Sequence, residues 1–405
     1  MNAKKPKPKD LLISGLAYSH MKKILFLNYE YPPLGGGAGV ATEALLREFS
    51  KNPNVEVHLV TSAVGPALEH ERVGGEVYVH RLPIGKDPKK LHSQSLRDIV
   101  VYTWRAWRFL VPFLRSQRTP FEVTLAFFTI PCGFIAYSLK WWIGLPYVVS
   151  LRGADVPGFS EKYDRFYFFL KPFIRYLWKK SERVIPNSMG LKRLAENTAP
   201  HQVMEIIENG VDIERFSPRQ SEEHMTLKPV VFLSVARLTK RKGIDLLLQA
   251  FGTMAQESPV PAKLLLAGDG EELGPLKELA KQLGITESIE FLGRVDHAQV
   301  ALLYNKVDVF VLPSKNEGMS NAALEALASG LPLIVSRTGG MSELVQNEVN
   351  GFLVDPQHRQ DFSQALLELV QSGEKRKKFG SESRRRAEER SWKRVADQFL
   401  DVLEA

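Results

Sequence analysis

Two glutamates separated by seven residues, Glu317 and Glu325, flank a segment that could hold an anion and a sugar side by side. An apolar run ends at Leu312, a polar loop follows, and a helix is predicted to begin near Ser320. Backbone N–H groups at a helix start, aided by the helix dipole, favour an anion such as phosphate. A carboxylate is a poor phosphate ligand but accepts hydrogen bonds from sugar hydroxyls. Glu325 either projects into the same cleft or is a surface helix residue, and the pattern leaves both open.

Alternating strands and helices must position this segment. In the N-terminal half, short apolar runs predict strands at Lys23–Asn28, Val55–Thr61, Val77–Leu82, Pro146–Leu151 and Arg183–Asn187. In the C-terminal half, a second series predicts strands at Val230–Val235, Lys263–Gly268, Ile289–Gly293, Val307–Leu312 and Pro332–Val335, with helices such as Gly243–Met254 and Ser320–Ser329. Such alternation is typical of parallel sheets covered by helices. Two doubly wound α/β units would place a ligand cleft between the C-terminal edges of their strands.

The stretch from Glu317 to Pro332 resembles the signature of the retaining glycosyltransferases of family 4, which have the GT-B architecture of two Rossmann-like domains facing across a cleft. The resemblance implies that Glu317 contacts the donor sugar and that Glu325 contacts the ribose of the nucleotide. The neighbouring loop residues Asn316, Gly318, Met319 and Ser320 are expected to bind substrate together with the two glutamates.

A second match follows the first predicted strand of the C-terminal half, where Arg237 and Lys242 lie five residues apart. The resemblance implies that both contact the donor diphosphate, although a cationic cluster can also be a solvated helix start. Cations in the cleft would stabilise the charge on the leaving diphosphate without a dedicated metal. We therefore expect Arg237, Lys242 and Glu317 to be the catalytic residues, with no cofactor and no metal. Gly268 and Arg294 lie in loops that resemble those lining the nucleotide-base pocket, where glycine allows close approach of the backbone.

The N-terminal half contributes a glycine loop and an arginine. Gly36 and Gly37, after Tyr31-Pro-Pro, resemble the family's glycine loop, which approaches donor phosphate or acceptor. The spacing G-x-G-x-x-G with a downstream ribose-binding acid is not met, which argues against a dinucleotide-binding dehydrogenase. Arg152 stands three residues before Asp155, where many family members have a histidine. Arginine stays charged and cannot act as a general base at neutral pH. It could bind phosphate, bind an anionic acceptor, or only pair with Asp155.

The predicted organisation has five parts. Residues 1–20 are expected to form a disordered leader, and 21–215 the N-terminal acceptor-side domain. A linker at 216–229 leads to the C-terminal donor domain at 230–390. Residues 391–405 are expected to form a helix that crosses back to the N-terminal domain.

Charge and composition limit the function classes. Residues 1–227 contain 31 lysines and arginines against 22 acidic residues, so the net charge of +8 resides in the N-terminal half. Such a basic half attracts phosphates, nucleic acid or an anionic membrane, or is an ordinary solvated surface. Base-reading motifs are missing, so no nucleic-acid partner is expected. The single cysteine, Cys132, excludes an intrachain disulfide and a four-cysteine zinc site.

Two segments, 97–115 and 162–180, combine arginines and lysines with aromatic residues at helical spacing. Basic amphipathic helices of this kind suit an anionic lipid surface, whereas a core helix with a solvated basic rim gives the same pattern. We therefore expect a cytoplasmic protein, peripheral at the inner face of the membrane if the first interpretation holds.

The leading hypothesis is a retaining, metal-independent hexosyltransferase that uses a UDP- or GDP-sugar. Its acceptor would be a sugar, a lipid-linked molecule or another hydroxyl compound, in cell-envelope polysaccharide or glycolipid synthesis. The alternatives are a nucleotide-sugar epimerase of the same architecture and a non-catalytic nucleotide-sugar-binding protein.

Overall fold

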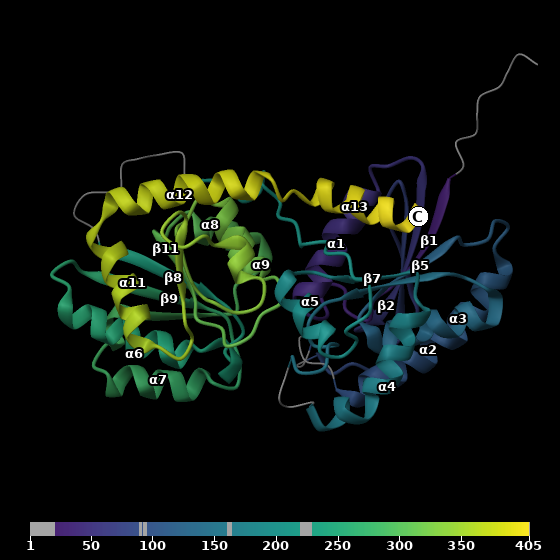
Figure 1. Cartoon of the computed structure of the whole chain (residues 1–405), viewed down its shortest axis with the longest axis horizontal. Helices are drawn as coiled ribbons and strands as arrows, with labels where there is room; N and C mark the ends of the chain where they lie inside the picture. The colour runs from purple at the N-terminus through teal and green to yellow at the C-terminus, as the bar shows by residue number, and fades with distance from the viewer. Residues whose placement is uncertain (1–20, 89–90, 92–94, 160–163, 219–228, 405) are drawn as a thin grey trace, which may run out of the picture.

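A computed structural model describes residues 21–88, 91, 95–159, 164–218 and 229–404. The chain forms two α/β domains side by side, each with a central sheet covered by helices (Figure 1). The predicted leader and most of the predicted linker lie outside the described residues.

The sheet of the N-terminal domain has seven strands in the order β3-β4-β2-β1-β5-β6-β7. Its strands are β1 (Lys22–Leu27), β2 (Val55–Ala63), β3 (Glu69–Gly74), β4 (Glu76–Pro83), β5 (Val123–Phe127), β6 (Tyr147–Leu151) and β7 (Arg183–Pro186). All pairs are parallel except β3 with β4. The sequence did not predict β3 and β5. Strand order reverses between β1 and β5, so the loops after these two strands flank a natural binding position.

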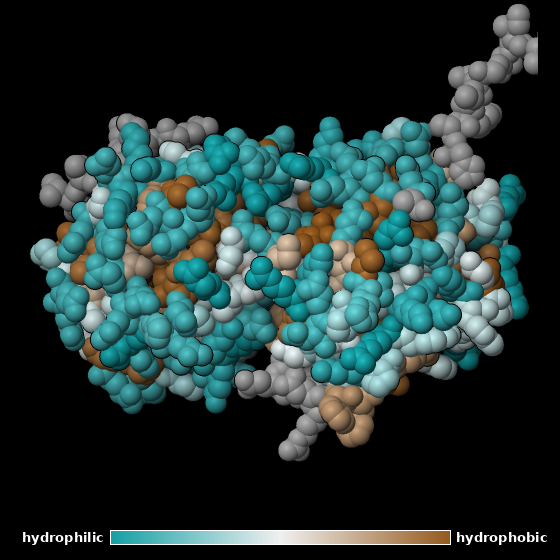
Figure 2. All heavy atoms as spheres, in the orientation of Figure 1, coloured by the Kyte–Doolittle hydropathy of each residue, from teal (hydrophilic) through white to brown (hydrophobic). Residues whose placement is uncertain are grey.

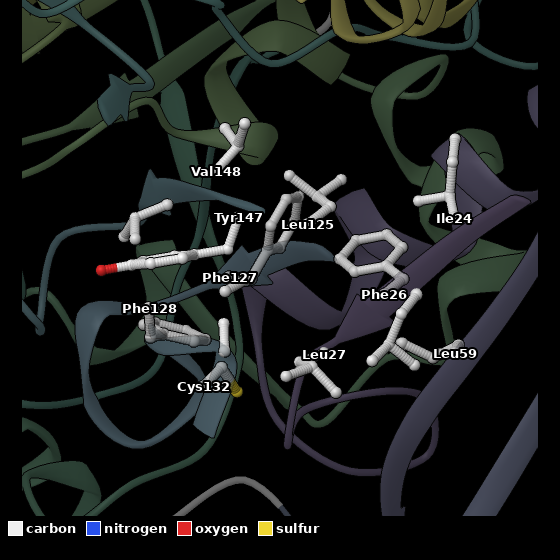
Figure 3. Packing of buried hydrophobic residues seen from close by; sticks show 14 of the residues in the cluster. Ile24, Phe26, Leu27, Leu59, Leu125, Phe127, Phe128, Cys132, Tyr147 and Val148 are labelled. Carbon is white, nitrogen blue, oxygen red and sulfur yellow. The ribbon is translucent and has the colours of Figure 1, made fainter. Parts of the chain in front are cut away.

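Helices pack on both faces of this sheet around an apolar core. They are α1 (Gly37–Phe49), α2 (Leu96–Ser116), α3 (Phe134–Ile143), α4 (Asp164–Lys180) and α5 (Met189–Glu196). Figure 3 shows part of the core, where Phe26 and Phe127 from adjacent strands meet edge to face with ring centroids 4.7 Å apart. Because β1, β5 and β6 are buried on both faces, these strands are nearly continuous apolar runs.

The C-terminal domain has a six-stranded, fully parallel sheet in the order β10-β9-β8-β11-β12-β13. Its strands are β8 (Val230–Val235), β9 (Ala262–Ala267), β10 (Ile289–Gly293), β11 (Val309–Leu312), β12 (Leu333–Ser336) and β13 (Gly351–Val354). Its helices are α6 (Ile244–Glu257), α7 (Leu273–Gln282), α8 (His297–Tyr304), α9 (Asn321–Ala328), α10 (Met341–Leu344), α11 (Arg359–Gln371) and α12 (Gly373–Glu388). Phe232 and Leu233, neighbours in β8, enter different core clusters on opposite faces. Strand order reverses between β8 and β11, the two strands that precede the predicted catalytic residues.

The last helix, α13 (Trp392–Glu404), leaves the C-terminal domain and packs on the N-terminal one (Figure 1). Trp392, Val395 and Phe399 join the core of the N-terminal domain, where the Phe399 ring lies 6.1 Å from that of Phe127. The helix therefore ties the two domains together at a second point besides the chain segment that links them.

Within the described ranges, no helix is both long and apolar enough to cross a membrane.

Candidate active site

A cavity of about 1570 Å³ lies between the two domains, at the C-terminal edges of both sheets. Its wall combines the glycine loop after β1 with the loops after β8, β9 and β11. The cavity therefore occupies the position where the strand orders reverse. Most of the site residues predicted from the sequence line it: Gly36, Gly37, Arg152, Asp155, Arg237, Lys242, Gly268, Arg294, Glu317, Gly318, Met319, Ser320 and Glu325.

Glu317 and Lys242 form a largely buried ion pair in this wall. The Lys242 ammonium donates to Oε1 of Glu317, whose exposed fraction is 8%. Burial alone would raise the pKa of Glu317, but Lys242 and Arg241 hold that pKa below its ordinary value. The pair is positioned by backbone packing, since a Cβ on Gly243 would lie 2.3 Å from the Pro313 carbonyl oxygen. Only glycine fits there, with a φ of +65°, so the loop after β8 can press against the loop after β11.

Glu325 is 8% exposed and lines the cavity, which excludes the surface-residue interpretation. It lies on the second turn of α9, where the Tyr304 hydroxyl approaches its Oε2 at 3.1 Å. The helix begins as expected, with the Ser320 hydroxyl accepting from the Ala323 N–H. Glu317 and Glu325 thus present two buried carboxylates on either side of a helix start.

Glu30, which the sequence did not point to, lies opposite on the N-terminal domain. Its Oε2 accepts a hydrogen bond of 3.2 Å from the Gly36 N–H. Burial raises the pKa of Glu30, while the Gly36 N–H and the positive charges of Arg237 and Lys86 oppose that rise. Arg237 therefore faces an anion across the cleft. The available signal was an acidic residue at the end of the first strand, just before the glycine loop.

Arg152 is held over an aromatic ring at the back of the cavity. Its guanidinium lies 3.5 Å from the centroid of Phe127, and Nη1 donates to Oδ1 of Asn209 at 2.9 Å. Within the described residues, Nε and Nη2 have no hydrogen-bond partner. Burial lowers the pKa of Arg152 to about 9, so the side chain stays protonated at neutral pH.

The Asp155 carboxylate accepts hydrogen bonds from its own loop and from Thr129. One oxygen accepts from the backbone and hydroxyl of Thr129 at 2.9 and 3.2 Å, and the other accepts from the N–H groups of Arg152 and Gly153 at 3.0 and 3.1 Å. Burial raises the pKa of Asp155, and these N–H groups counteract the rise. Because four donors already occupy the carboxylate, it fixes the loop that carries Arg152.

Two family models match the chain. The model described as Glycosyltransferase Family 4 matches residues 35–215, and the model described as Glycosyl transferases group 1 matches residues 217–386. The chain belongs to the family 4, group 1 glycosyltransferases. The resemblance seen in the sequence is thereby confirmed.

Relatives of this glycosyltransferase match it over nearly full length. An uncharacterized glycosyltransferase of Methanocaldococcus jannaschii is 28% identical, over 94% of this chain and 97% of its own. N-acetyl-alpha-D-glucosaminyl L-malate synthase of Bacillus anthracis is 26% identical, over 87% of this chain and 89% of its own.

Solved structures confirm the predicted GT-B fold. Sucrose-phosphate synthase from Thermosynechococcus elongatus superposes with a TM-score of 0.80 at 20% identity, covering 95% of this chain and 98% of that one. HepE of Anabaena, in complex with UDP-glucose, superposes with a TM-score of 0.72 at 18% identity, covering 94% and 99%.

Asn316 of this glycosyltransferase differs from the expectation. It is not among the described residues that line the cavity, and its side-chain amide donates to the Phe159 carbonyl oxygen at 2.7 Å. Because Phe159 belongs to the N-terminal domain, Asn316 bridges the two domains.

A second bridge runs through asparagines that the sequence did not single out for the site. The Asn209 amide donates to Oδ1 of Asn321 at 2.8 Å, and the Asn321 amide donates to the Gly37 carbonyl oxygen at 3.1 Å. This chain of hydrogen bonds joins the start of α9 to the glycine loop, so the two halves of the site are in contact across the cleft.

The remaining predicted residues shape the wall. Gly268 has a φ of +143°, and a Cβ there would lie 1.8 Å from the Ala236 carbonyl oxygen. Only glycine allows the loop after β9 to pack against the loop after β8 at this point. Arg294 is exposed at the rim. No group of three or more metal-ligating side chains occurs in the described part of the chain.

Proposed function

We propose that this glycosyltransferase transfers a hexosyl-type sugar from a UDP- or GDP-sugar to a hydroxyl acceptor with retention of configuration. The observation that carries the proposal is the buried Lys242–Glu317 pair beside the start of α9, facing the glycine loop across the cavity. A nucleotide diphosphate offers both anions and hydroxyls, and this wall offers cations and carboxylates at neighbouring positions.

In this mechanism Arg237 and Lys242 bind the diphosphate and stabilise its charge as the bond to the anomeric carbon breaks, in place of a metal. Glu317 accepts hydrogen bonds from the donor sugar, and Glu325 accepts from the ribose. The acceptor oxygen bonds to the anomeric carbon on the face that the diphosphate leaves. The proton of the acceptor hydroxyl passes to the departing phosphate oxygen, so no enzyme base is required.

Lys242 would gain a second partner during this reaction. Without donor it neutralises Glu317, and with donor it would also face the diphosphate. A pre-formed pair keeps both side chains in place, so little reorganisation is needed when the diphosphate binds.

The test is release of nucleotide from a panel of UDP- and GDP-sugars offered with varied hydroxyl acceptors. UDP-sugars come first, because HepE was solved with UDP-glucose. Release with none of the donors would refute the transferase proposal. Interconversion of sugars without release would favour the epimerase, and binding without turnover a non-catalytic protein. The anomeric configuration of the product, read by NMR, must match the donor if retention is correct.

Glu317→Gln should lower turnover at least about 100-fold, because the amide keeps the shape but loses the charge that the donor and Lys242 contact. The matched control is Glu287→Gln, the same change at an exposed position of the C-terminal domain. Turnover of Glu317→Gln within a few-fold of the unmodified protein would show that the glutamate is misassigned.

The proposal extends to an anionic membrane surface at the cytoplasmic face, with envelope polysaccharide or glycolipid synthesis as the pathway class. Its support is α4, where Phe168 and Phe169 are 70% and 79% exposed and Lys171, Lys179 and Lys180 follow on the same helix. Figure 2 shows an apolar protrusion at the lower end of the N-terminal domain, over α4. Co-sedimentation with anionic vesicles at moderate salt tests it, and no binding would remove the membrane from the proposal.

A further inference from the structure

The cavity between the domains continues along one face of α2. Residues spaced along about three turns of that helix line it: Leu96, Ile99, Val100, Thr103, Trp104 and Trp107. Because α2 follows β4 and runs back along the sheet, its turns lead from the reaction centre toward the outside. From Leu96 to Trp107 the helix rises about 16 Å at 1.5 Å per residue. Phe134, Ile135 and Ser138 of α3 form the facing wall, and we name this extension the α2–α3 arm.

Apart from the indole N–H groups of Trp104 and Trp107, the α2–α3 arm offers few groups for a polar ligand to bind. Its two hydroxyl groups are engaged by their own helices. The Thr103 hydroxyl donates to the Ile99 carbonyl oxygen at 2.7 Å, and the Ser138 hydroxyl donates to the Phe134 carbonyl oxygen at 2.9 Å. A saccharide that lies against the arm would find few polar partners to replace the water it displaces. A hydrocarbon chain would gain from burial.

The solvent-exposed face of the α2–α3 arm is apolar, and cationic side chains lie beside it. Leu96, Val100 and Trp104 are 61%, 66% and 54% exposed, which is unusual for large apolar side chains. Arg105 and Arg108 stack on the Trp104 ring, with guanidinium carbons 5.3 and 5.1 Å from its centroid. Among the described residues, neither arginine forms an ion pair. This face therefore suits a phosphate-bearing lipid or an anionic membrane surface.

We propose that the α2–α3 arm binds the hydrocarbon chain of a lipid-linked acceptor, whose hydroxyl reaches the donor at the inner end. The inference rests on the proposed transferase function and names the class of its acceptor. Continuity decides the occupant. The same cavity joins the sugar site to an apolar groove. A ligand that fills both parts therefore combines a polar, hydroxyl-bearing head with a long apolar chain.

The experiment uses the full chain and a series of n-alkyl glucosides from butyl to decyl, each below its micelle concentration. Neutral, identical heads leave chain length as the only variable. Tryptophan fluorescence reports binding, because Trp104 and Trp107 lie in the arm. The dissociation constant should fall about fourfold per added methylene, from about 0.8 kcal/mol for each buried CH₂. An affinity independent of chain length would overturn the proposal.

Two variants locate the binding. Val100→Arg places a charge on the exposed face of the arm, and Thr103→Phe fills the arm without adding charge. Each should weaken decyl glucoside binding at least about tenfold. The control is Leu302→Arg, which alters a similarly exposed side chain in the C-terminal domain and should bind normally. Equal losses in all three variants, or none in the first two, would refute a site in the arm.

Failure of the transferase proposal would be distinguishable, because nucleotide binding and release are measured without any glucoside. Glucoside binding that depends on alkyl-chain length, without nucleotide release, would refute the transferase proposal and leave a lipid-binding arm. Nucleotide release by the unmodified protein, together with a glucoside affinity that does not depend on alkyl-chain length, would refute only the proposal for the arm.

Discussion

Gly190, at the start of α5, is the residue whose substitution should separate the two domains with least harm to either. A Cβ on Gly190 would lie 2.5 Å from the carbonyl carbon and oxygen of Gly339 in the C-terminal domain. Ordinary contact begins near 3.4 Å, so Gly190→Ala must push the two backbones apart by about 0.9 Å. Within the helix itself, alanine is favoured over glycine by about 1 kcal/mol. The N-terminal domain should therefore fold as well as before, or better.

The displacement would act on catalysis because, in the proposed mechanism, the donor is bound by the C-terminal domain and the acceptor by the N-terminal domain. A misplacement of about 1 Å between reacting groups can cost about 100-fold in rate. We expect Gly190→Ala to lower kcat by that order while donor binding to the C-terminal domain stays nearly unchanged.

The assay pairs steady-state turnover with nucleotide binding and thermal unfolding. All six tryptophans lie on α2, α3, α4 or α13, so their fluorescence reports unfolding of the N-terminal domain. The control is Gly274→Ala on α7, where an added Cβ meets nothing within 4 Å. Turnover of Gly190→Ala within twofold of the unmodified protein would refute the reasoning. An equal loss in Gly274→Ala would do so as well.

Two further predictions concern pH. Burial beside His58 and His70 lowers the pKa of His80 to about 3, so the unfolded chain binds a proton below about pH 6.5 that the folded chain refuses. Stability of the N-terminal domain should drop by about 2–3 kcal/mol between pH 6.5 and 4.5 in urea unfolding, and His80→Phe should flatten that drop. Burial, with Glu208 adding to it, raises the pKa of Glu343 to about 7, where its carboxyl group accepts from the Met189 N–H across the domain interface. Because the pKa is higher in the contact than the ordinary 4.5, protonation of Glu343 favours the contact between the domains. That contact should therefore weaken as pH rises from about 4.5 to about 7, and Glu343→Gln should remove this change from the pH profile of kcat.

The fold and the main site residues were predictable because their signals are local. Arg237, Lys242 and Glu317 each follow an apolar strand within a few residues, and parallel strands bring their C-terminal ends to one edge. Continuous apolar runs are harder to assign. β5, Val123–Phe127, is buried on both faces and shows no alternation. β3, Glu69–Gly74, is a polar edge strand held by backbone pairing with β4.

Contacts between the domains could not be predicted from local patterns. The hydrogen bond from Asn321 to the Gly37 carbonyl oxygen joins residues 284 positions apart, and it depends on how the two sheets face each other. Asn316 likewise could not be predicted as an interdomain contact, because its amide donates to the Phe159 carbonyl oxygen of the other domain. In both cases a motif residue turned out to be a bridge, because the donor loop touches the N-terminal domain directly.

Arg152 shows how the two kinds of information combine. From the sequence, an arginine in place of a histidine argued only that no base stands there. In the structure its guanidinium lies on Phe127 and is held by Asn209, whose amide in turn donates to Asn321 of the other domain. Even with its pKa lowered to about 9, the side chain carries its charge at neutral pH and cannot accept the acceptor's proton. A fixed cation there would instead attract the negative charge that develops on the leaving phosphate, whose oxygen is then the atom left to take the proton. The position of Arg152 thus supports the base-free mechanism proposed above, and it links that mechanism to closure, because the residue that holds the cation also holds the domains together.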